Sequence, residues 1–200
     1  ACILYNSIMK TKKYFFTTYD LILSALFVAL ITVGAFIKIP VGPVPITLQF
    51  MFVLLAGQIL NPKSAAITLV IYILMGLLGL PVFSGGGGLN YVLTPSFGYI
   101  LGFVFAAISV SVISRKSKSS FSILLLANFI GFLLVYICGL GYYILLNIFY
   151  FNKMVDLSAL LLIGFVVFIP TDVAFCILTA VISKRIKPII RERLDIYQMV

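Results

Sequence analysis

Asp172 is the residue of this 200-residue chain whose type and position most strongly suggest chemistry. Of the five acids, it alone lies well inside an apolar run, near the middle of residues 157–183. If that run crosses a membrane, a charge at its centre costs about 2.5–3.5 kcal/mol and marks a candidate functional site. Pro170 lacks an N–H and is expected to loosen the helix there. We interpret Asp172 as a ligand contact; the alternative is a carboxyl that is protonated, packed against a helix or close to the membrane interface.

The other side chains that could recognise a ligand are neutral. Gln49 lies at the start of an apolar run beside a proline-rich stretch, Asn90 lies two residues after four consecutive glycines, and Tyr99 lies at the start of a further run. Neutral donors and acceptors around an apolar surface suit a small, partly apolar ligand. Tyr99 fits equally well as an aromatic residue at a membrane interface.

Several kinds of chemistry are excluded by what the sequence lacks. It contains no histidine, which removes Ser/His and Cys/His nucleophiles and histidine metal ligands. Its three cysteines are far apart in the chain. Residues 57–64 imitate a phosphate-binding loop, but Pro62 stands where a glycine must precede Lys63, and proline has no N–H to wrap a phosphate. We therefore expect neither an enzyme nor a cofactor or metal site.

Composition indicates a membrane protein. Hydrophobic residues make up 63% of the chain and charged residues 10%, whereas an average soluble domain is about half apolar and about a quarter charged. These values exclude a soluble or a disordered chain, and the length suits one integral membrane domain over residues 1–200. The net charge of +9 comes from basic clusters between apolar runs, which is typical of membrane topology and not of nucleic-acid binding.

The apolar runs predict an all-α, polytopic membrane protein, a compact bundle of six transmembrane helices in the lipid bilayer. A spanning helix needs about 17–25 residues, so the short second run is expected to tilt or to cross only in part. The long fifth run is expected to contain a break near Gly139 and Gly141. The expected helices cover about residues 21–37, 47–60, 64–82, 97–114, 121–149 and 157–183.

The basic residues predict the orientation of this bundle. With six spans, twelve of the 14 Lys and Arg residues fall on one side, and only Lys38 and Lys153 fall on the other. Short, positively charged loops stay in the cytoplasm. We therefore expect a multi-pass protein of the cell membrane with both termini in the cytoplasm.

The two expected outer loops have unusual compositions. Residues 38–46 contain three prolines, and residues 82–96 contain four consecutive glycines. Irregular backbone at membrane depth is tolerated only where it is buried in protein or lines a cavity. The loops therefore favour a capture site that opens to the outside, and the alternative is two ordinary exposed loops.

Pairs of small residues four positions apart predict smooth helix faces. Ala25 and Ala29 form one pair, and Gly98 and Gly102 form another. Such a face allows close helix contact, either inside the bundle or with a partner protein. From spacing alone, internal packing is favoured.

Three stretches resemble the BioY family: residues 42–88, residues 95–103 (PSFGYILGF) and residues 167–173 (VFIPTDV). This family comprises the biotin-binding S components of energy-coupling factor (ECF) transporters. The resemblance implies six membrane helices with biotin bound near the outer face. It implies that the vitamin passes inward through association with a transmembrane coupling protein and two ATPases. It also implies that Ala25 and Ala29 match the small-residue patch that docks on the coupling protein.

Two departures from the family pattern affect the expected ligand. Many members carry Lys three residues after the acid of the sixth helix, where this chain has Phe175, and many place a polar residue within the glycine run. Without that lysine, backbone N–H groups of Gly86 and Gly87, or the side chain of Lys38, could hold a ligand carboxylate. We expect biotin, with its ureido N–H groups on Asp172. Lipoate, or a membrane scaffold without a ligand, is the alternative.

Overall fold

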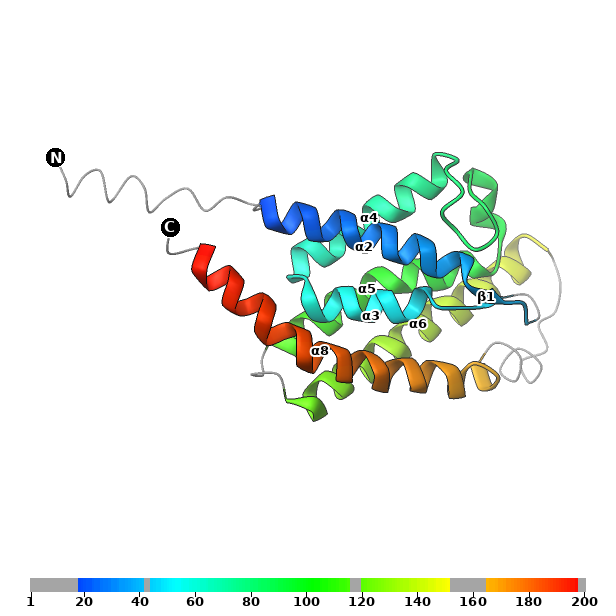
Figure 1. Ribbon diagram of the computed structural model, residues 1–200. Helices are drawn as coiled ribbons and strands as arrows, with labels where there is room; N and C mark the ends of the chain where they lie inside the picture. Colours follow the sequence, from blue (N-terminus) through cyan, green and yellow to red (C-terminus); the bar gives the residue numbers. More distant parts are fainter. Residues whose placement is uncertain (1–17, 42–43, 116–119, 152–164, 198–200) are drawn as a thin grey trace.

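The computed structural model describes residues 18–41, 44–115, 120–151 and 165–197, with side chains described up to residue 190 (Figure 1). The described part of the chain is mostly helical. Its elements are α2 (Thr18–Phe36), β1 (Lys38–Ile39), β2 (Ile46–Thr47), α3 (Gln49–Ile59), α4 (Pro62–Leu77), the 3-10 helix η1 (Leu89–Leu93), α5 (Ser96–Arg115), α6 (Phe121–Phe149) and α8 (Ile169–Tyr197).

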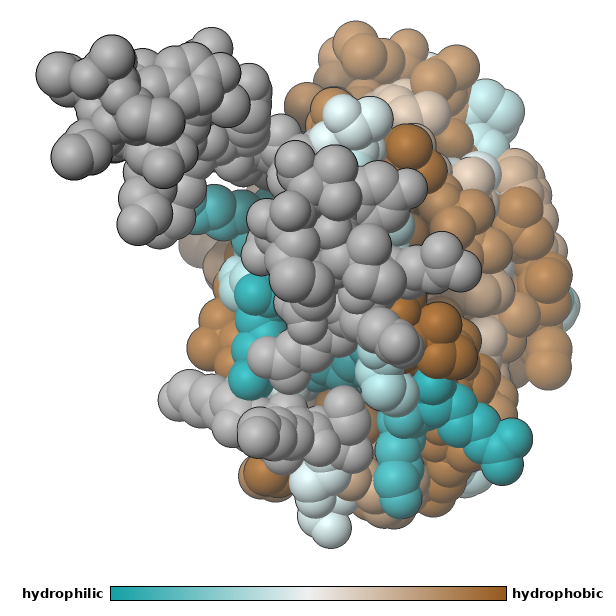
Figure 2. All heavy atoms as spheres, turned by 60° about the vertical axis from the view of Figure 1, so that its left-hand side comes forward, coloured by the Kyte–Doolittle hydropathy of each residue, from teal (hydrophilic) through white to brown (hydrophobic). Residues whose placement is uncertain are grey.

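The α-helices run alternately between two ends of the molecule. At the first end, here called the base end, α2 begins, the short α3–α4 turn lies, and α8 finishes (Figure 1). At the second end, here called the loop end, lie the β1–β2 hairpin and the glycine-rich loop between α4 and α5. Figure 2 turns the base end forward, and hydrophilic residues gather there while hydrophobic residues cover the flank.

Three of the described helices, α2, α5 and α6, are long and apolar enough to cross a membrane. The apolar helices α3 and α4 are shorter. With 11 residues, α3 is about 17 Å long at about 1.5 Å per residue, little more than half of a bilayer core of about 30 Å. Because α3 is short and begins beneath the hairpin, it leaves space between the hairpin and its own first turn at the loop end.

Helices α5 and α6 pack tightly through glycines. A Cβ atom added at Gly98 would lie 2.3 Å from the Cβ of Tyr142, and one added at Gly102 would lie 2.8 Å from the Cα of Val135. The glycine pair of α5 therefore serves internal packing. Ala25 and Ala29 on α2 are instead exposed.

The expected break in the fifth segment is wrong, because α6 is continuous over 29 residues. Gly139 is buried against the ring of Tyr99, with only 2.6 Å between an added Cβ and the ring atoms. A glycine at this position thus admits an aromatic side chain without interrupting the helix.

The position expected for Asp172 is also wrong. The structure places Asp172 in the first turn of α8 and not near the middle of a helix, and Pro170 lies in the same turn. Proline is tolerated there because a first-turn N–H needs no partner within the helix. The start of the expected helix, residues 157–164, lies outside the described residues.

A buried polar network joins three helices in the half of the bundle nearer the base end. The Gln58 amide on α3 donates to Asn128 Oδ1 (2.5 Å) and to the Leu124 carbonyl (3.1 Å) of α6. Asn128 donates in turn to the Cys176 carbonyl of α8 (2.8 Å). Because Gln58 and Asn128 are almost fully buried, these bonds fix the register of α8 against α3 and α6.

We predict that Gly102→Ala lowers the thermal denaturation temperature of the detergent-solubilised protein, because overpacking a core costs about 1–3 kcal/mol. Gly141→Ala is the matched control on α6, since an added Cβ there meets nothing within 4 Å. Alanine at 141 is expected to be neutral or slightly stabilising. Equal effects of the two substitutions would contradict the tight α5–α6 contact.

Candidate binding site

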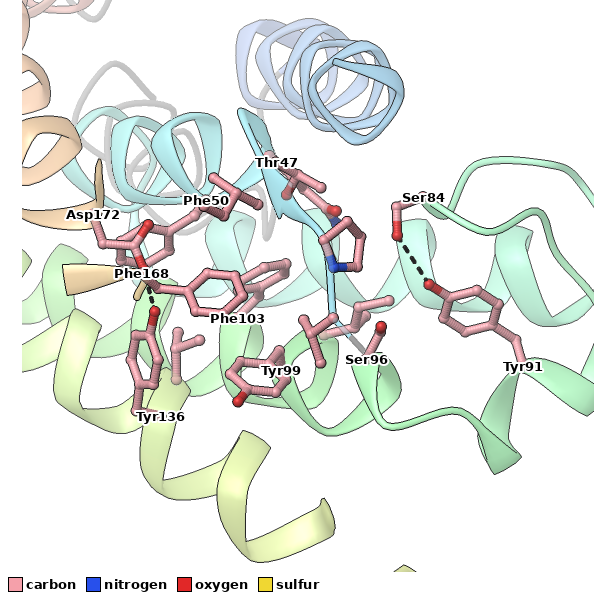
Figure 3. Close-up of a pocket in the computed structure, with 16 residues that line it drawn as sticks. Thr47, Phe50, Ser84, Tyr91, Ser96, Tyr99, Phe103, Tyr136, Phe168 and Asp172 are labelled. Atoms are coloured by element: carbon pink, nitrogen blue, oxygen red, sulfur yellow. Dashed lines mark hydrogen bonds between the residues drawn. The ribbon is translucent and has the colours of Figure 1, made fainter. Parts of the chain in front are cut away.

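A pocket lies at the loop end, in the space above the start of α3. Its walls come from the hairpin, the glycine-rich loop and helices α3, α5, α6 and α8 (Figure 3). The lining residues are Val44, Pro45, Ile46, Thr47, Gln49, Phe50, Ser84, Tyr91, Ser96, Tyr99, Ile100, Phe103, Val135, Tyr136, Phe168 and Asp172.

One carboxylate lies at the end of the pocket formed by α6 and α8. Asp172 is only 7% exposed, and its Oδ2 accepts a hydrogen bond from the Tyr136 hydroxyl (Figure 3). The Tyr136 ring is held edge-on by Tyr99 (5.7 Å between ring centroids) and by Phe165 (5.0 Å), and Phe132 contacts it at 4.7 Å. These ring contacts hold the Tyr136 phenol in place. Its hydrogen bond then sets the orientation of the Asp172 carboxylate.

Gln49 has a defined amide orientation. The Tyr72 hydroxyl donates its single hydrogen to the Val82 carbonyl (2.8 Å), so toward Gln49 it can only accept. Gln49 therefore turns its Nε2 group toward Tyr72, at 2.9 Å. The Gln49 carbonyl oxygen is then the atom that this side chain can offer to a ligand, and it is an acceptor.

The opposite end of the pocket carries hydroxyl groups and a nearby cation. Ser84 Oγ and the Tyr91 hydroxyl lie 3.1 Å apart, well separated from Asp172 (Figure 3). The Lys38 ammonium, on β1, donates to the carbonyl of Ser84. This bond connects the hairpin to the glycine-rich loop, and it sets a positive charge at the pocket rim.

The glycine-rich loop is anchored by Phe83. Phe83 is fully buried between Tyr72 (5.5 Å) and Tyr91 (4.6 Å), and its ring covers the backbone of Gly76 so closely that an added Cβ would lie 2.0 Å away. Beyond it, Gly86 adopts a φ of 116°, which favours glycine. The loop therefore needs its glycines for shape.

The remaining walls of the pocket are aromatic and aliphatic. Phe50 and Phe103 stack at 6.3 Å, and Phe168 covers the α8 side (Figure 3). The cavity volume is about 50 Å³, whereas pockets for small ligands usually hold about 300–1,000 Å³. Side chains and the hairpin thus fill most of the site, and a ligand of vitamin size must displace part of this lining.

A second hollow lies on the outside of the bundle, between α2 and α4. Its volume is about 770 Å³, and its lining is almost entirely apolar. Ala25 and Ala29 line it, and their small side chains leave it deep. We call this hollow the α2–α4 groove.

Comparison with known proteins assigns the family. The model of the BioY family matches residues 9–192. The chain is 40% identical over 177 residues to the probable biotin transporter BioY of Lysinibacillus sphaericus. The matched residues cover 88% of this chain and 90% of the relative. The chain belongs to the BioY family. It is also 36% identical to the biotin transporter BioY of Thermotoga maritima, over 87% of this chain and 99% of the relative.

A solved structure extends the BioY family match to the fold. The S-component for biotin from an ECF-type ABC transporter superposes with a TM-score of 0.73 at 33% identity, covering 86% of this chain and 95% of that protein. The family and its apolar helices mark the chain as a membrane transport protein and not an enzyme.

The structure brings together three of the seven ligand-contact candidates. Asp172, Gln49 and Tyr99 line the pocket. Asn90 and Gly87 are exposed in the glycine-rich loop, and Gly86 is half-buried there. These three and Lys38 stand outside the pocket lining.

Tyr136 and Ser84 also line the pocket, and the sequence analysis did not predict them. Tyr136 stands among aliphatic residues of an uninterrupted apolar run and has no distinguishing spacing, and its partner lies 36 positions away. Ser84 directly precedes the glycine run, and this position is the one local feature of the sequence that could have indicated its place in the pocket.

Proposed function

We propose that the chain is the substrate-binding subunit of a vitamin uptake transporter that captures biotin from outside. In this proposal it passes the vitamin to the cytoplasm together with an ECF coupling protein and two ATPases. The observation that carries the proposal is the polarity of the pocket. Buried acceptors, Asp172 and Gln49, line the pocket, while a cation, Lys38, stands at its rim beside Ser84.

Biotin has the complementary polarity. Its ureido ring carries two N–H donors, its thioether ring is apolar, and its side chain ends in a carboxylate. In the proposed pose the ureido N–H groups donate to Asp172 and Gln49, Tyr99 adds a polar contact, and the aromatic walls hold the rings. The carboxylate then points to the outer loops, where Lys38, Asn90 and the N–H groups of Gly86 and Gly87 are available after the lining has moved.

Lipoate fits the acceptor end less well. Its dithiolane ring has no N–H group, so Asp172 and Gln49 would each be left with an unpaired buried oxygen. A site built to bond a donor discriminates strongly against an analogue that lacks it. The convergence of these acceptors on one pocket also argues against a scaffold subunit without a ligand.

The proposed topology has six membrane spans with both termini in the cytoplasm. The base end carries Lys63, Arg115, Lys184 and Arg185, whereas Lys38 lies at the loop end. Positive charge concentrates in cytoplasmic loops, which supports a cytoplasmic base end and an outward-facing pocket. The basic residues near the N-terminus, Lys116, Lys118 and Lys153 lie outside the described residues.

The proposed partner surface is the α2–α4 groove around Ala25 and Ala29. An exposed apolar hollow on a membrane helix allows close approach of a second helix, and small side chains at its base favour this packing. We propose that the coupling protein docks here, with the ATPases bound to the coupling protein.

We predict that the purified protein binds biotin and that Asp172→Asn weakens binding about tenfold or more, since hydrogen bonds to buried charged groups are worth about 1.5–3 kcal/mol. Lys38→Met is expected to weaken the binding of biotin but not that of biotinamide, which lacks the carboxylate. Lipoate should bind at least about a hundredfold more weakly than biotin. Isothermal titration calorimetry measures all of these affinities.

Asp20→Asn is the matched control for this test, because Asp20 lies at the base end, where it accepts a hydrogen bond from Asn61 (2.9 Å). Biotin affinity should not change in that variant. If the folded protein binds no biotin, or if Asp172→Asn binds as well as the unmodified chain, the proposed ligand contact is wrong.

We predict that a membrane-impermeant maleimide labels Asn90→Cys in intact cells, and that it labels Lys63→Cys only after the membrane has been opened. The two positions are exposed at opposite ends of the bundle. The unmodified chain is the control, because any labelling of it comes from its own cysteines. Labelling of Lys63→Cys in intact cells would contradict a cytoplasmic base end.

We predict that the double substitution of Ala25 and Ala29 by Leu prevents co-purification with the coupling protein and ATPases but preserves biotin binding, because it fills the groove and not the pocket. Ala174→Leu is the matched control, since Ala174 is exposed on α8 away from the groove. Unchanged complex formation by the double variant would show that the partner docks elsewhere.

A further inference from the structure

Among the described residues that line the pocket, one side chain is charged, and it is the acid Asp172. Asp172 is almost fully buried, and the hydrogen bond that its carboxylate receives comes from a neutral phenol, that of Tyr136. The cation described at the rim, Lys38, donates a hydrogen bond to the carbonyl of Ser84. Ser84 lies at the end of the site far from Asp172 (Figure 3). The Tyr136 phenol therefore does not compensate the charge of the carboxylate, and Lys38 is bonded elsewhere.

Burial disfavours the charged form of the Asp172 side chain, and two neighbouring features offset part of this cost. The first turn of α8 carries the positive end of the helix dipole, which stabilises an anion. The phenol donates to Oδ2 and leaves Oδ1 as an acceptor. The second nearby hydroxyl, that of Tyr99, belongs to a group that can accept as well as donate. Both phenol oxygens can therefore accept a hydrogen bond from the ligand. A ligand head that carries only N–H groups can thus be accommodated.

We propose that this pocket takes a cationic cyclic guanidinium as well as the neutral cyclic urea of biotin, and that Asp172 contributes more to binding the cation. This inference rests on the proposed function, because it concerns the same pocket and the same ring. With a guanidinium both partners of the hydrogen bonds are charged, whereas with the urea only the carboxylate is charged. A buried ion pair of this kind compensates its desolvation only where hydrogen bonds satisfy its remaining polar atoms.

Phe175 is the position from which this selectivity can be reversed. It follows Asp172 by three residues in α8, so the two side chains lie on neighbouring positions of one helix face. Phe175 is half-buried and packs against the core. A lysine at this position can bring its ammonium to the Asp172 carboxylate and neutralise it, whereas a methionine of similar length cannot.

The test compares biotin with 2-iminobiotin, its cyclic guanidine analogue, at neutral pH by isothermal titration calorimetry. Both ligands should bind the unmodified protein. Asp172→Asn should weaken 2-iminobiotin at least about tenfold more than it weakens biotin, because it removes an ion pair in one case and a hydrogen bond from a neutral donor in the other. Phe175→Lys should shift the ratio of the two affinities in the same direction, and Phe175→Met should leave the ratio unchanged.

The outcomes separate this inference from the function on which it rests. Binding of biotin without binding of 2-iminobiotin overturns the inference alone, as does an equal loss of both ligands in Asp172→Asn and in Phe175→Lys. Failure of both ligands to bind the folded, unmodified protein overturns the proposed function as well. Thermal denaturation of each variant without ligand confirms that it is folded.

Discussion

The structure of the loop end depends on one interaction, the hydrogen bond from Tyr136 to the buried carboxylate of Asp172. An unpaired buried charge is costly, so α6 and α8 must meet in a register that brings these two side chains together. The bond from Asn128 to the Cys176 carbonyl sets that register one helical turn further along α8. Aromatic contacts from Tyr99, Phe132 and Phe165 then restrict the phenol. The polar bonds therefore position the site, and the apolar packing keeps it rigid.

Much of this arrangement follows from the sequence, because rare residues are informative in an apolar chain. The helical segments and the candidates Asp172, Gln49 and Tyr99 were identifiable as polar groups inside or beside apolar runs, and the structure brings these three to one pocket. Tyr136 was not identifiable, because its role depends on packing between helices distant in sequence. The break expected at Gly139 failed for a related reason, since that glycine accommodates the ring of Tyr99 from α5. Local patterns predict elements, whereas the contacts between elements decide what a glycine or tyrosine does.

A short chain of hydrogen bonds runs from the pocket to the α2–α4 groove. Gln49 lines the pocket and bonds to Tyr72, which bonds to the carbonyl of Val82, and Val82 lines the groove. Gly34 of α2 lies so close to α3 that an added Cβ would be 2.9 Å from the backbone nitrogen of Gln49. Helix α2 also continues directly into the hairpin that covers the pocket. In the proposed function the cavity of about 50 Å³ must enlarge to admit a vitamin, and a hairpin displaced in this way would act on the same helix that carries Ala25 and Ala29. Tightly packed elements transmit such shifts because they cannot deform independently. The close contact at Gly34 and the direct continuation of α2 into the hairpin thus make α2 the element that links the pocket to the groove.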